Sequence, residues 1–334
     1  MFRKRIAVDL GTANTLIHVP GQGVVLNAPS MVAIDSESRR VLAVGADAKT
    51  FLGKTPQGID VVRPLKDGVI ADFDMAGELL RQLLRQSIGS SNLSRPDVLI
   101  CVPLNITNVE RRAVIEAAQA AGAHTVQLIA EPMAGAVGAH LPVLEPEGHM
   151  VVDIGGGTTD IAVISVGALS GARCLRLAGD TFTRVIQDRM REQFNLSIGE
   201  NMAERTKIAV GALVPSGSPL SATVSGKDLR TGAPKTVRVC DDDLRPALLD
   251  TAQPIVDAVL EVLEGTPPEL GGDLLTRGML LTGGGALLRG MDTLLSGAAR
   301  IPAVLDDEPL TTVLRGAAIV LEHLDRYSEL LLQE

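Results

Sequence analysis

Residues 151–164 read VVDIGGGTTDIAVI: an apolar strand, an Asp at its end, a turn of small residues and a second apolar strand. The first half of the chain opens with the same order of features, since residues 6–19 read IAVDLGTANTLIHV. Each half is therefore headed by one copy of a strand–turn–strand unit. This repetition indicates an internal duplication.

The two turns are suited to binding phosphate. Gly, Thr and Asn let backbone N–H groups approach phosphate oxygens, because no large side chain intervenes, and hydroxyls add donors. Asp9 and Asp153, one before each turn, can hold Mg²⁺ directly or through water, since this ion prefers carboxylate, water and phosphate oxygens. An ordinary hairpin turn would explain a single copy. Two copies instead predict a pair of hairpins that clamp a nucleotide tail.

A third glycine-rich turn follows the strand-like residues 279–281 and reads TGGGALLRG over residues 282–290. A strand, three glycines and a helix again allow close backbone approach to a ligand. The dinucleotide-binding pattern G-x-G-x-x-G fails, because Asp160 and Leu288 stand where it needs its last glycine. A Walker A loop over residues 48–55 fails because its first glycine is missing.

Short apolar runs alternate with helical patterns along the chain, which is typical of α/β layers. The clearest helix is predicted over residues 109–121, where Thr107 and Glu110 form a capping box and Gly122 ends the helix. Residues 141–148 contain two prolines and a glycine and read as a linker. This linker divides the chain into nearly equal halves.

The composition narrows the class of protein. The 334 residues carry 31 basic and 40 acidic side chains, a net charge of −9, and 46% are apolar, which indicates about two folded domains. With five Phe, one Tyr and no Trp, the acidic chain is not expected to bind nucleic acid. Three dispersed cysteines predict neither disulfides nor a zinc site and favour the cytoplasm. We expect no signal peptide or membrane span, hence a soluble or peripheral protein.

Taken together, these motifs resemble those of the actin, Hsp70 and sugar kinase superfamily. Within it, the chain is similar to the MreB family of bacterial actins over nearly its whole length. The matching stretches are dispersed in order along the chain, which makes the resemblance specific. They are residues 9–15 (DLGTANT), 63–74 (RPLKDGVIADFD), 110–117 (ERRAVIEA), 131–133 (EPM), 151–159 (VVDIGGGTT), 266–270 (TPPEL) and 281–290 (LTGGGALLRG).

The resemblance implies an α/β actin-like ATPase fold. Two duplicated lobes with ribonuclease H-like cores, each carrying a smaller inserted subdomain, would flank a nucleotide cleft. The linker and residues 315–318 would act as a hinge, so that nucleotide state biases lobe closure. The implied bounds are residues 1–143 plus 315–334 for lobe I, with an insertion over about 32–66, and residues 144–314 for lobe II, with an insertion over about 180–253.

The resemblance also implies that ATP or ADP binds in the cleft with Mg²⁺, which Asp9 and Asp153 would organise through water. Glu204 and Lys207, three apart on one helix face, would contact the nucleoside. Without the family they read as a solvated ion pair. The implied nucleotide-binding residues are Thr12, Ala13, Asn14, Gly155, Gly156, Gly157, Thr158, Gly179, Glu204, Arg205, Thr206, Lys207, Gly283, Gly284, Gly285, Ala286 and Leu287.

Glu131 is the implied catalytic residue. It lies where the strand-like residues 126–130 end and Pro132 begins a helix, a position that can aim a side chain into the cleft. The match to the family's Glu-Pro implies that Glu131 orients or deprotonates the water that attacks the γ-phosphate. A helix-capping carboxylate is the alternative.

MreB proteins polymerise head to tail on ATP, pair as antiparallel double filaments and lie on the inner face of the cytoplasmic membrane. There they guide cell-wall synthesis together with membrane proteins of the elongation machinery. The resemblance therefore implies a slow ATPase that forms a homopolymer and sets rod shape. The apolar stripe of helix 109–121 either packs in the core, its more ordinary use, or pairs protofilaments.

Other members of the superfamily remain as alternatives. An Hsp70-type ATPase would need a substrate-binding region for which we expect no room, and a sugar kinase would need an acceptor site that has no signature here. A filament that segregates DNA is a closer rival. The chain reads Ala178-Gly179 where the family often has Gly-Gly, and Arg205-Thr206 where an acidic-apolar pair is usual. These departures keep open a divergent paralogue with little ATP turnover.

Two segments are candidates for membrane contact. Met1 and Phe2 stand beside three basic residues, and Leu93 is a lone apolar residue in the polar stretch 89–94. A frayed basic terminus and an isolated surface leucine would look the same. Both signals are therefore weak.

Overall fold

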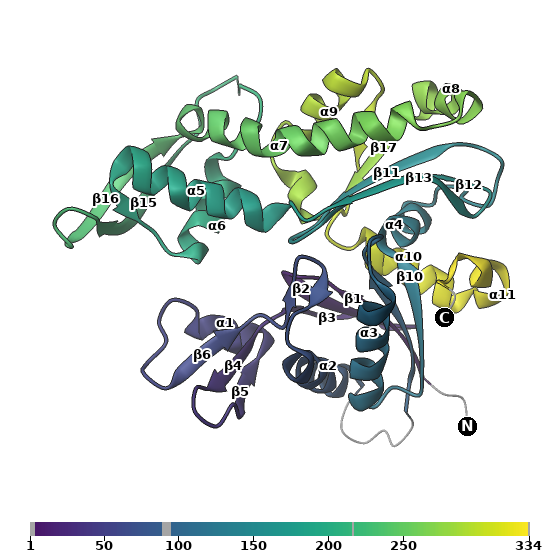
Figure 1. Cartoon of the computed structure of the whole chain (residues 1–334), viewed down its shortest axis with the longest axis horizontal. Helices are drawn as coiled ribbons and strands as arrows, with labels where there is room; N and C mark the ends of the chain where they lie inside the picture. The colour runs from purple at the N-terminus through teal and green to yellow at the C-terminus, as the bar shows by residue number, and fades with distance from the viewer. Residues whose placement is uncertain (1–3, 89–94, 216, 333–334) are drawn as a thin grey trace.

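The computed structural model describes residues 4–88, 95–215 and 217–332. Its two five-stranded sheets share one strand order. In each, three consecutive antiparallel strands are extended by two parallel strands from later in the chain. The sheets occupy the lower and upper halves of Figure 1. The duplication predicted from the two strand–turn–strand units is confirmed.

The first sheet has the order β10-β9-β1-β2-β3 and is buried on both faces. Its strands are β1 (Arg5–Leu10), β2 (Asn14–Val19), β3 (Gly23–Pro29), β9 (Asp97–Val102) and β10 (Thr125–Ala130). Its helices are α2 (Phe73–Ile88) and α3 (Asn108–Ala120) on one face and α4 (Glu131–Gly138) and α10 (Thr312–Glu322) on the other. Ile6 and Val8 pack toward α2 and α3, whereas Ala7 packs toward α4 and α10, as strand alternation requires.

The second sheet has the order β13-β12-β11-β17-β18 and repeats this layering. Its elements are β11 (His149–Ile154), β12 (Thr159–Ser165), β13 (Ala168–Leu175), β17 (Met279–Thr282), β18 (Ala303–Leu305), α5 (Gly179–Phe194), α7 (Asp241–Glu264), α8 (Pro268–Arg277) and α9 (Met291–Ala299). Val152 and Ile154 pack on one face of the sheet with α5, α7 and α9, whereas Val151 packs on the other face with α4 and α10. The helices α4 and α10 therefore form a layer shared by both sheets.

A small three-stranded sheet lies within each predicted insertion. The first contains β4 (Val32–Asp35), β5 (Val41–Val44), β6 (Ile59–Val62) and α1 (Gly45–Phe51); the second contains β14 (Leu196–Ser197), β15 (Ser221–Asp228), β16 (Pro234–Cys240) and α6 (Glu200–Val210). The remaining elements are β7 (Leu65–Lys66), β8 (Val69–Ile70), the 3₁₀ turns η1 (Gly284–Leu287) and η2 (Ser328–Leu330), and α11 (Leu324–Tyr327). Three predicted bounds fall inside helices: residue 180 within α5, residue 253 within α7 and residue 315 within α10.

The predicted capping box of α3 is confirmed. The backbone N–H of Glu110 donates to Thr107 Oγ1 at 3.2 Å, and the backbone N–H of Thr107 donates to Glu110 Oε2 at 2.7 Å. The apolar stripe of this helix is used in the core, since Val114, Ala117 and Ala118 are buried against the first sheet. No helix in the described ranges is long and apolar enough to cross a membrane.

The helices α4 and α10 approach each other through glycine. A Cβ on Gly316 would lie 1.7 Å from the carbonyl oxygen of Ala134, and one on Gly138 would lie 2.0 Å from that of Thr312. The Arg315 guanidinium donates to the Gly138 carbonyl at 2.7 Å and pairs with Asp306 at 3.0 Å. This crossing brings α4 and α10 into close backbone contact within the layer that both sheets share.

Candidate functional site

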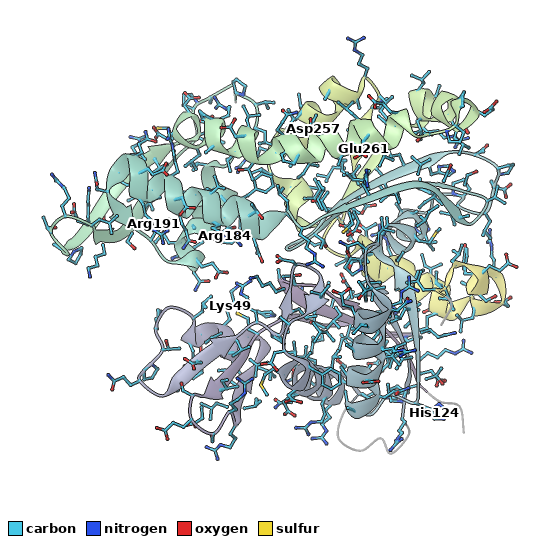
Figure 2. All side chains as sticks on the ribbon, viewed as in Figure 1. Lys49, His124, Arg184, Arg191, Asp257 and Glu261 are labelled. Atoms are coloured by element: carbon cyan, nitrogen blue, oxygen red, sulfur yellow. The ribbon has the colours of Figure 1, made fainter. Side chains whose placement is uncertain are left out.

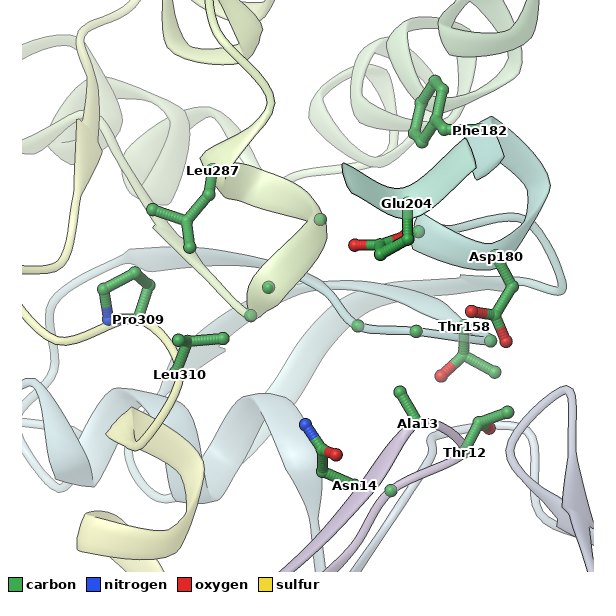
Figure 3. Close-up of a pocket in the computed structure, with 18 of the residues that line it drawn as sticks. Thr12, Ala13, Asn14, Thr158, Asp180, Phe182, Glu204, Leu287, Pro309 and Leu310 are labelled. Atoms are coloured by element: carbon green, nitrogen blue, oxygen red, sulfur yellow. The ribbon is translucent and has the colours of Figure 1, made fainter. Parts of the chain in front are cut away.

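A cavity of about 590 Å³ lies between the two sheets, and both predicted lobes contribute to its wall. In Figure 3, Thr12, Ala13 and Asn14 of the β1–β2 turn lie across from Thr158 of the β11–β12 turn. The approach is so close that a Cβ on Gly156 would lie 2.8 Å from Ala13 Cβ. The small-residue turns, recognisable in the sequence, are therefore brought face to face.

The first turn is braced by hydroxyl groups. Ser30 Oγ donates to the Gly11 carbonyl at 2.6 Å, and its backbone N–H donates to the Ala13 carbonyl at 2.9 Å. Thr12 Oγ1 accepts a hydrogen bond from the backbone N–H of Gly68 at 3.0 Å. These contacts fix the path of the turn, so its backbone is preorganised toward the cavity.

The second turn is attached to the first turn of α5. The backbone N–H groups of Gly179 and Asp180 donate to the carbonyls of Gly155 and Gly156 at 3.1 and 2.8 Å. A glycine-rich turn beside a helix N-terminus is an arrangement that suits anionic phosphate groups.

The triple-glycine turn closes the far end of the cavity. Gly283 has φ +83°, and a Cβ there would lie 2.4 Å from Asp153 Oδ1, so only glycine fits. Leu287 and Leu310 are about half exposed, at 47% and 55%. Both line the cavity at the end opposite Asp180 (Figure 3). This end offers backbone and aliphatic surface on which a flat base can lie.

The ion pair on α6 is anchored to the cavity wall. Lys207 Nζ lies 2.7 Å from Glu204 Oε2 and donates to the Gly179 carbonyl at 2.9 Å and to Thr183 Oγ1 at 3.0 Å. The lysine side chain is only 14% exposed. Lys207 is therefore not freely solvated, whereas the Glu204 side chain is 42% exposed, and the role of the pair toward a nucleotide stays a prediction.

Three carboxyl groups, those of Asp9, Glu131 and Asp153, line the cavity, and the buried carboxyl of Asp160 interacts with those of Glu131 and Asp153. Burial raises the pKa of Asp9 to about 7 and that of Asp160 to about 6. The pKa values of Glu131 and Asp153 are held well above their usual range. Burial is the larger cause, and repulsion from neighbouring carboxyl groups is the smaller one. Asp160 Oδ1 accepts a hydrogen bond from the backbone N–H of Leu104 at 2.8 Å. The other carboxyl oxygen of Asp160, Oδ2, is buried and has no hydrogen-bond partner among the described residues. Carboxyl oxygens are ligands that suit Mg²⁺, but no three carboxylate, His or Cys side chains among the described residues are arranged to hold a metal ion by themselves.

Glu131 lies where it was predicted, at the junction between β10 and α4, and its side chain lines the cavity. Ala130 is the N-cap residue of α4, and no side chain caps the helix there. The geometry therefore favours a carboxyl group aimed into the cavity over a helix cap.

Most of the predicted nucleotide-binding residues line the cavity, but three do not. Arg205 is exposed, and its guanidinium folds back onto the Asn201 carbonyl of its own helix. Thr206 is buried and donates to the Met202 carbonyl, and the Ala286 side chain packs in the core of the second lobe. Adjacent helix positions point in different directions, so four consecutive residues of α6 cannot all face one cavity.

Sequence reasoning missed several residues of the cavity wall. Arg63, Lys49 and Glu200 contribute charge, while Pro309 and Leu310 contribute apolar surface. None of the motifs quoted above includes Lys49, Pro309 or Leu310. Arg63 opens one of the matched stretches, but no spacing rule indicated that it reaches the second lobe.

Two sheets of identical strand order, joined through shared helices and separated by a glycine-lined cavity, define the actin-like class of proteins. The fold superposes on the crystal structure of MreB 5 of Spiroplasma citri bound to AMPPNP with a TM-score of 0.92 and 36% sequence identity, over 98% of this chain and 99% of that one. Residues 3–329 match the family model described as MreB/Mbl protein, and the chain belongs to this family.

The curated relatives are similar over almost their full length. The cell shape-determining protein Mbl of Bacillus cereus is 46% identical over 326 residues, covering 98% of both chains. The cell shape-determining protein MreB of Escherichia coli is 47% identical over 333 residues, covering 98% of this chain and 96% of the relative. The family expected from the dispersed motifs is confirmed.

Proposed function

We propose that this chain binds ATP with Mg²⁺ in the cavity, hydrolyses it slowly and assembles into filaments that help to determine cell shape. The main observation behind the proposal is that two small-residue turns suited to phosphate face each other across one cavity. These turns are Thr12–Asn14 and Gly155–Thr158. The related MreB 5 of Spiroplasma citri has been crystallised with AMPPNP and with ADP, which supports the choice of ligand.

Each part of a bound nucleotide would contact a different part of the cavity wall. The backbone N–H groups of the two turns would hold the phosphates, and Lys207 with Glu204 would meet the nucleoside. The aliphatic end at Leu287 would take the base. Asp9 and Asp153 would hold Mg²⁺, which when bound draws charge from the β- and γ-phosphate oxygens. Glu131 would orient the attacking water and accept its proton.

The assembly part of the proposal rests on the family. Its relatives are named cell shape-determining proteins. We extend to this chain antiparallel double filaments, attachment to the inner face of the cytoplasmic membrane, and contact with membrane proteins of the elongation machinery. Residues 1–3 and 89–94, which hold most of the predicted membrane candidates, lie outside the described residues. Val114, Ala117 and Ala118 of α3 pack in the core, so a protofilament contact on this helix would have to use its exposed side chains.

Sedimentation with ATP–Mg²⁺, ADP–Mg²⁺ or no nucleotide, each with and without anionic vesicles, tests this proposal. We expect filaments to pellet with ATP, far less protein to pellet with ADP, and the ATP form to float with the vesicles. Equal pelleting under all three conditions would contradict nucleotide-driven assembly. Filaments that never float with vesicles would contradict the membrane part alone.

A further inference from the structure

Arg63 joins the two lobes at the cavity. It follows β6 in the first insertion, and its guanidinium pairs with Asp180 at 3.4 Å and with Glu200 at a shorter distance. All three residues line the cavity. Their side chains are 26%, 35% and 42% exposed, so the bridge lies toward solvent and away from the buried carboxyl groups. Both ion pairs of Arg63 tie residues 32–66 to the second lobe.

The two acidic partners begin the two helices that shape the other side of the cavity. Asp180 is in the first turn of α5, whose backbone N–H groups hold the Gly155–Gly157 turn. Glu200 is the first residue of α6, which carries Glu204 and Lys207. A single guanidinium therefore connects the first insertion both to the phosphate side and to the nucleoside side of the second lobe.

The charges around Arg63 determine what it can do. Lys49 of α1 also lines the cavity and lies on the side of the first insertion that faces the second lobe (Figure 2). Burial raises the pKa of Asp180, and the positive charge of Arg63 opposes that rise. Because Arg63 is already engaged by two carboxylates, a phosphate would have to compete with both of them for its donors.

We infer that Arg63 is a gate for nucleotide exchange, an inference that rests on the proposed nucleotide site. The bridge to Asp180 and Glu200 must break before the insertions separate and the cavity opens, whether a nucleotide is entering or leaving. It therefore slows both steps by the same factor and leaves the equilibrium affinity almost unchanged. If Arg63 instead bound phosphate, its loss would weaken affinity and leave entry no faster.

Stopped-flow fluorescence with a fluorescent ATP analogue and Mg²⁺ separates these outcomes. In Arg63→Gln, association and dissociation should both accelerate about fivefold, a size expected for partly exposed ion pairs acting together, while Kd stays within about twofold. Arg63→Lys should lie between, because it keeps the charge but loses the forked donor geometry. Added salt should accelerate exchange in the wild type more than in Arg63→Gln, since it screens the exposed bridge.

Arg39→Gln is the matched control, because it removes a guanidinium from the same insertion whose ion pair with Asp72 stays within the first lobe. Its exchange rates should equal those of the wild type. Unchanged rates in Arg63→Gln would overturn the gate, and a weakened Kd without faster association would make Arg63 a phosphate ligand instead. A wild type that binds no nucleotide would contradict the proposed function itself.

Discussion

Glu131→Gln is expected to slow phosphate release from ATP by about 100-fold or more, the usual contribution of a positioned general base. ATP affinity should stay within about twofold, because the substitution keeps the shape of the side chain and leaves both phosphate turns intact. The folded protein should not be weakened. Burial, Asp160, Asp153 and Asp9 hold the pKa of Glu131 well above its usual range, so this carboxyl costs stability at neutral pH, where the unfolded chain ionises it freely, and glutamine removes that cost.

Single-turnover phosphate release, measured beside a nucleotide titration and a thermal melt, checks this result. Glu116→Gln is the control, because Glu116 is an exposed glutamate of α3 far from the cavity wall. Full hydrolysis by Glu131→Gln would remove Glu131 from the chemistry. Loss of ATP binding together with hydrolysis would instead assign it to binding.

Gly316→Ala is expected to destabilise the fold by about 3 kcal/mol or more, the upper range for overpacking. Its new methyl group would lie 1.7 Å from the Ala134 carbonyl oxygen and 2.7 Å from the Gly138 backbone nitrogen. Both of these atoms belong to helix backbone, so no side chain can rotate away. Relief requires α4 and α10 to separate, which would disrupt the core that both sheets share.

Urea denaturation compares this variant with Gly297→Ala. Gly297 lies inside α9, and a Cβ there meets nothing within 4 Å. Alanine at Gly297 should stabilise the chain by about 0.5–1 kcal/mol through helix propensity alone. The same substitution thus has opposite signs at two helical glycines. Equal midpoints for the two variants would contradict the tight crossing of α4 and α10.

The features predicted correctly from the sequence are those that depend on residues close together in the chain. The apolar runs around Asp9 and Asp153, the turns after them and the capping box of α3 all formed where expected. Both phosphate-turn candidates reached one cavity because duplicated units place equivalent turns at equivalent sheet edges. The family resemblance supplied the remaining expectations, including the position of Glu131 at the cavity.

What escaped prediction depends on contacts between distant parts of the chain. Arg63 and Glu200 are 137 residues apart in sequence and meet only because the two insertions fold toward each other. The directions of Arg205 and Thr206 depend on the rotation of α6 about its axis, which no residue type reveals. The glycines at the α4–α10 crossing are explained only once the two helices are seen in contact.

The central claim is that the two turns form one nucleotide site, and calorimetric titration with ATP–Mg²⁺ tests it most directly. The wild type and Gly199→Ala, whose Cβ meets nothing within 4 Å, should bind one ATP with equal affinity. Gly156→Ala should bind about tenfold more weakly, because its Cβ would lie 2.8 Å from Ala13 Cβ and force the turns apart. A wild type that binds no ATP, or a Gly156→Ala variant that binds it as tightly as Gly199→Ala, would contradict the claim.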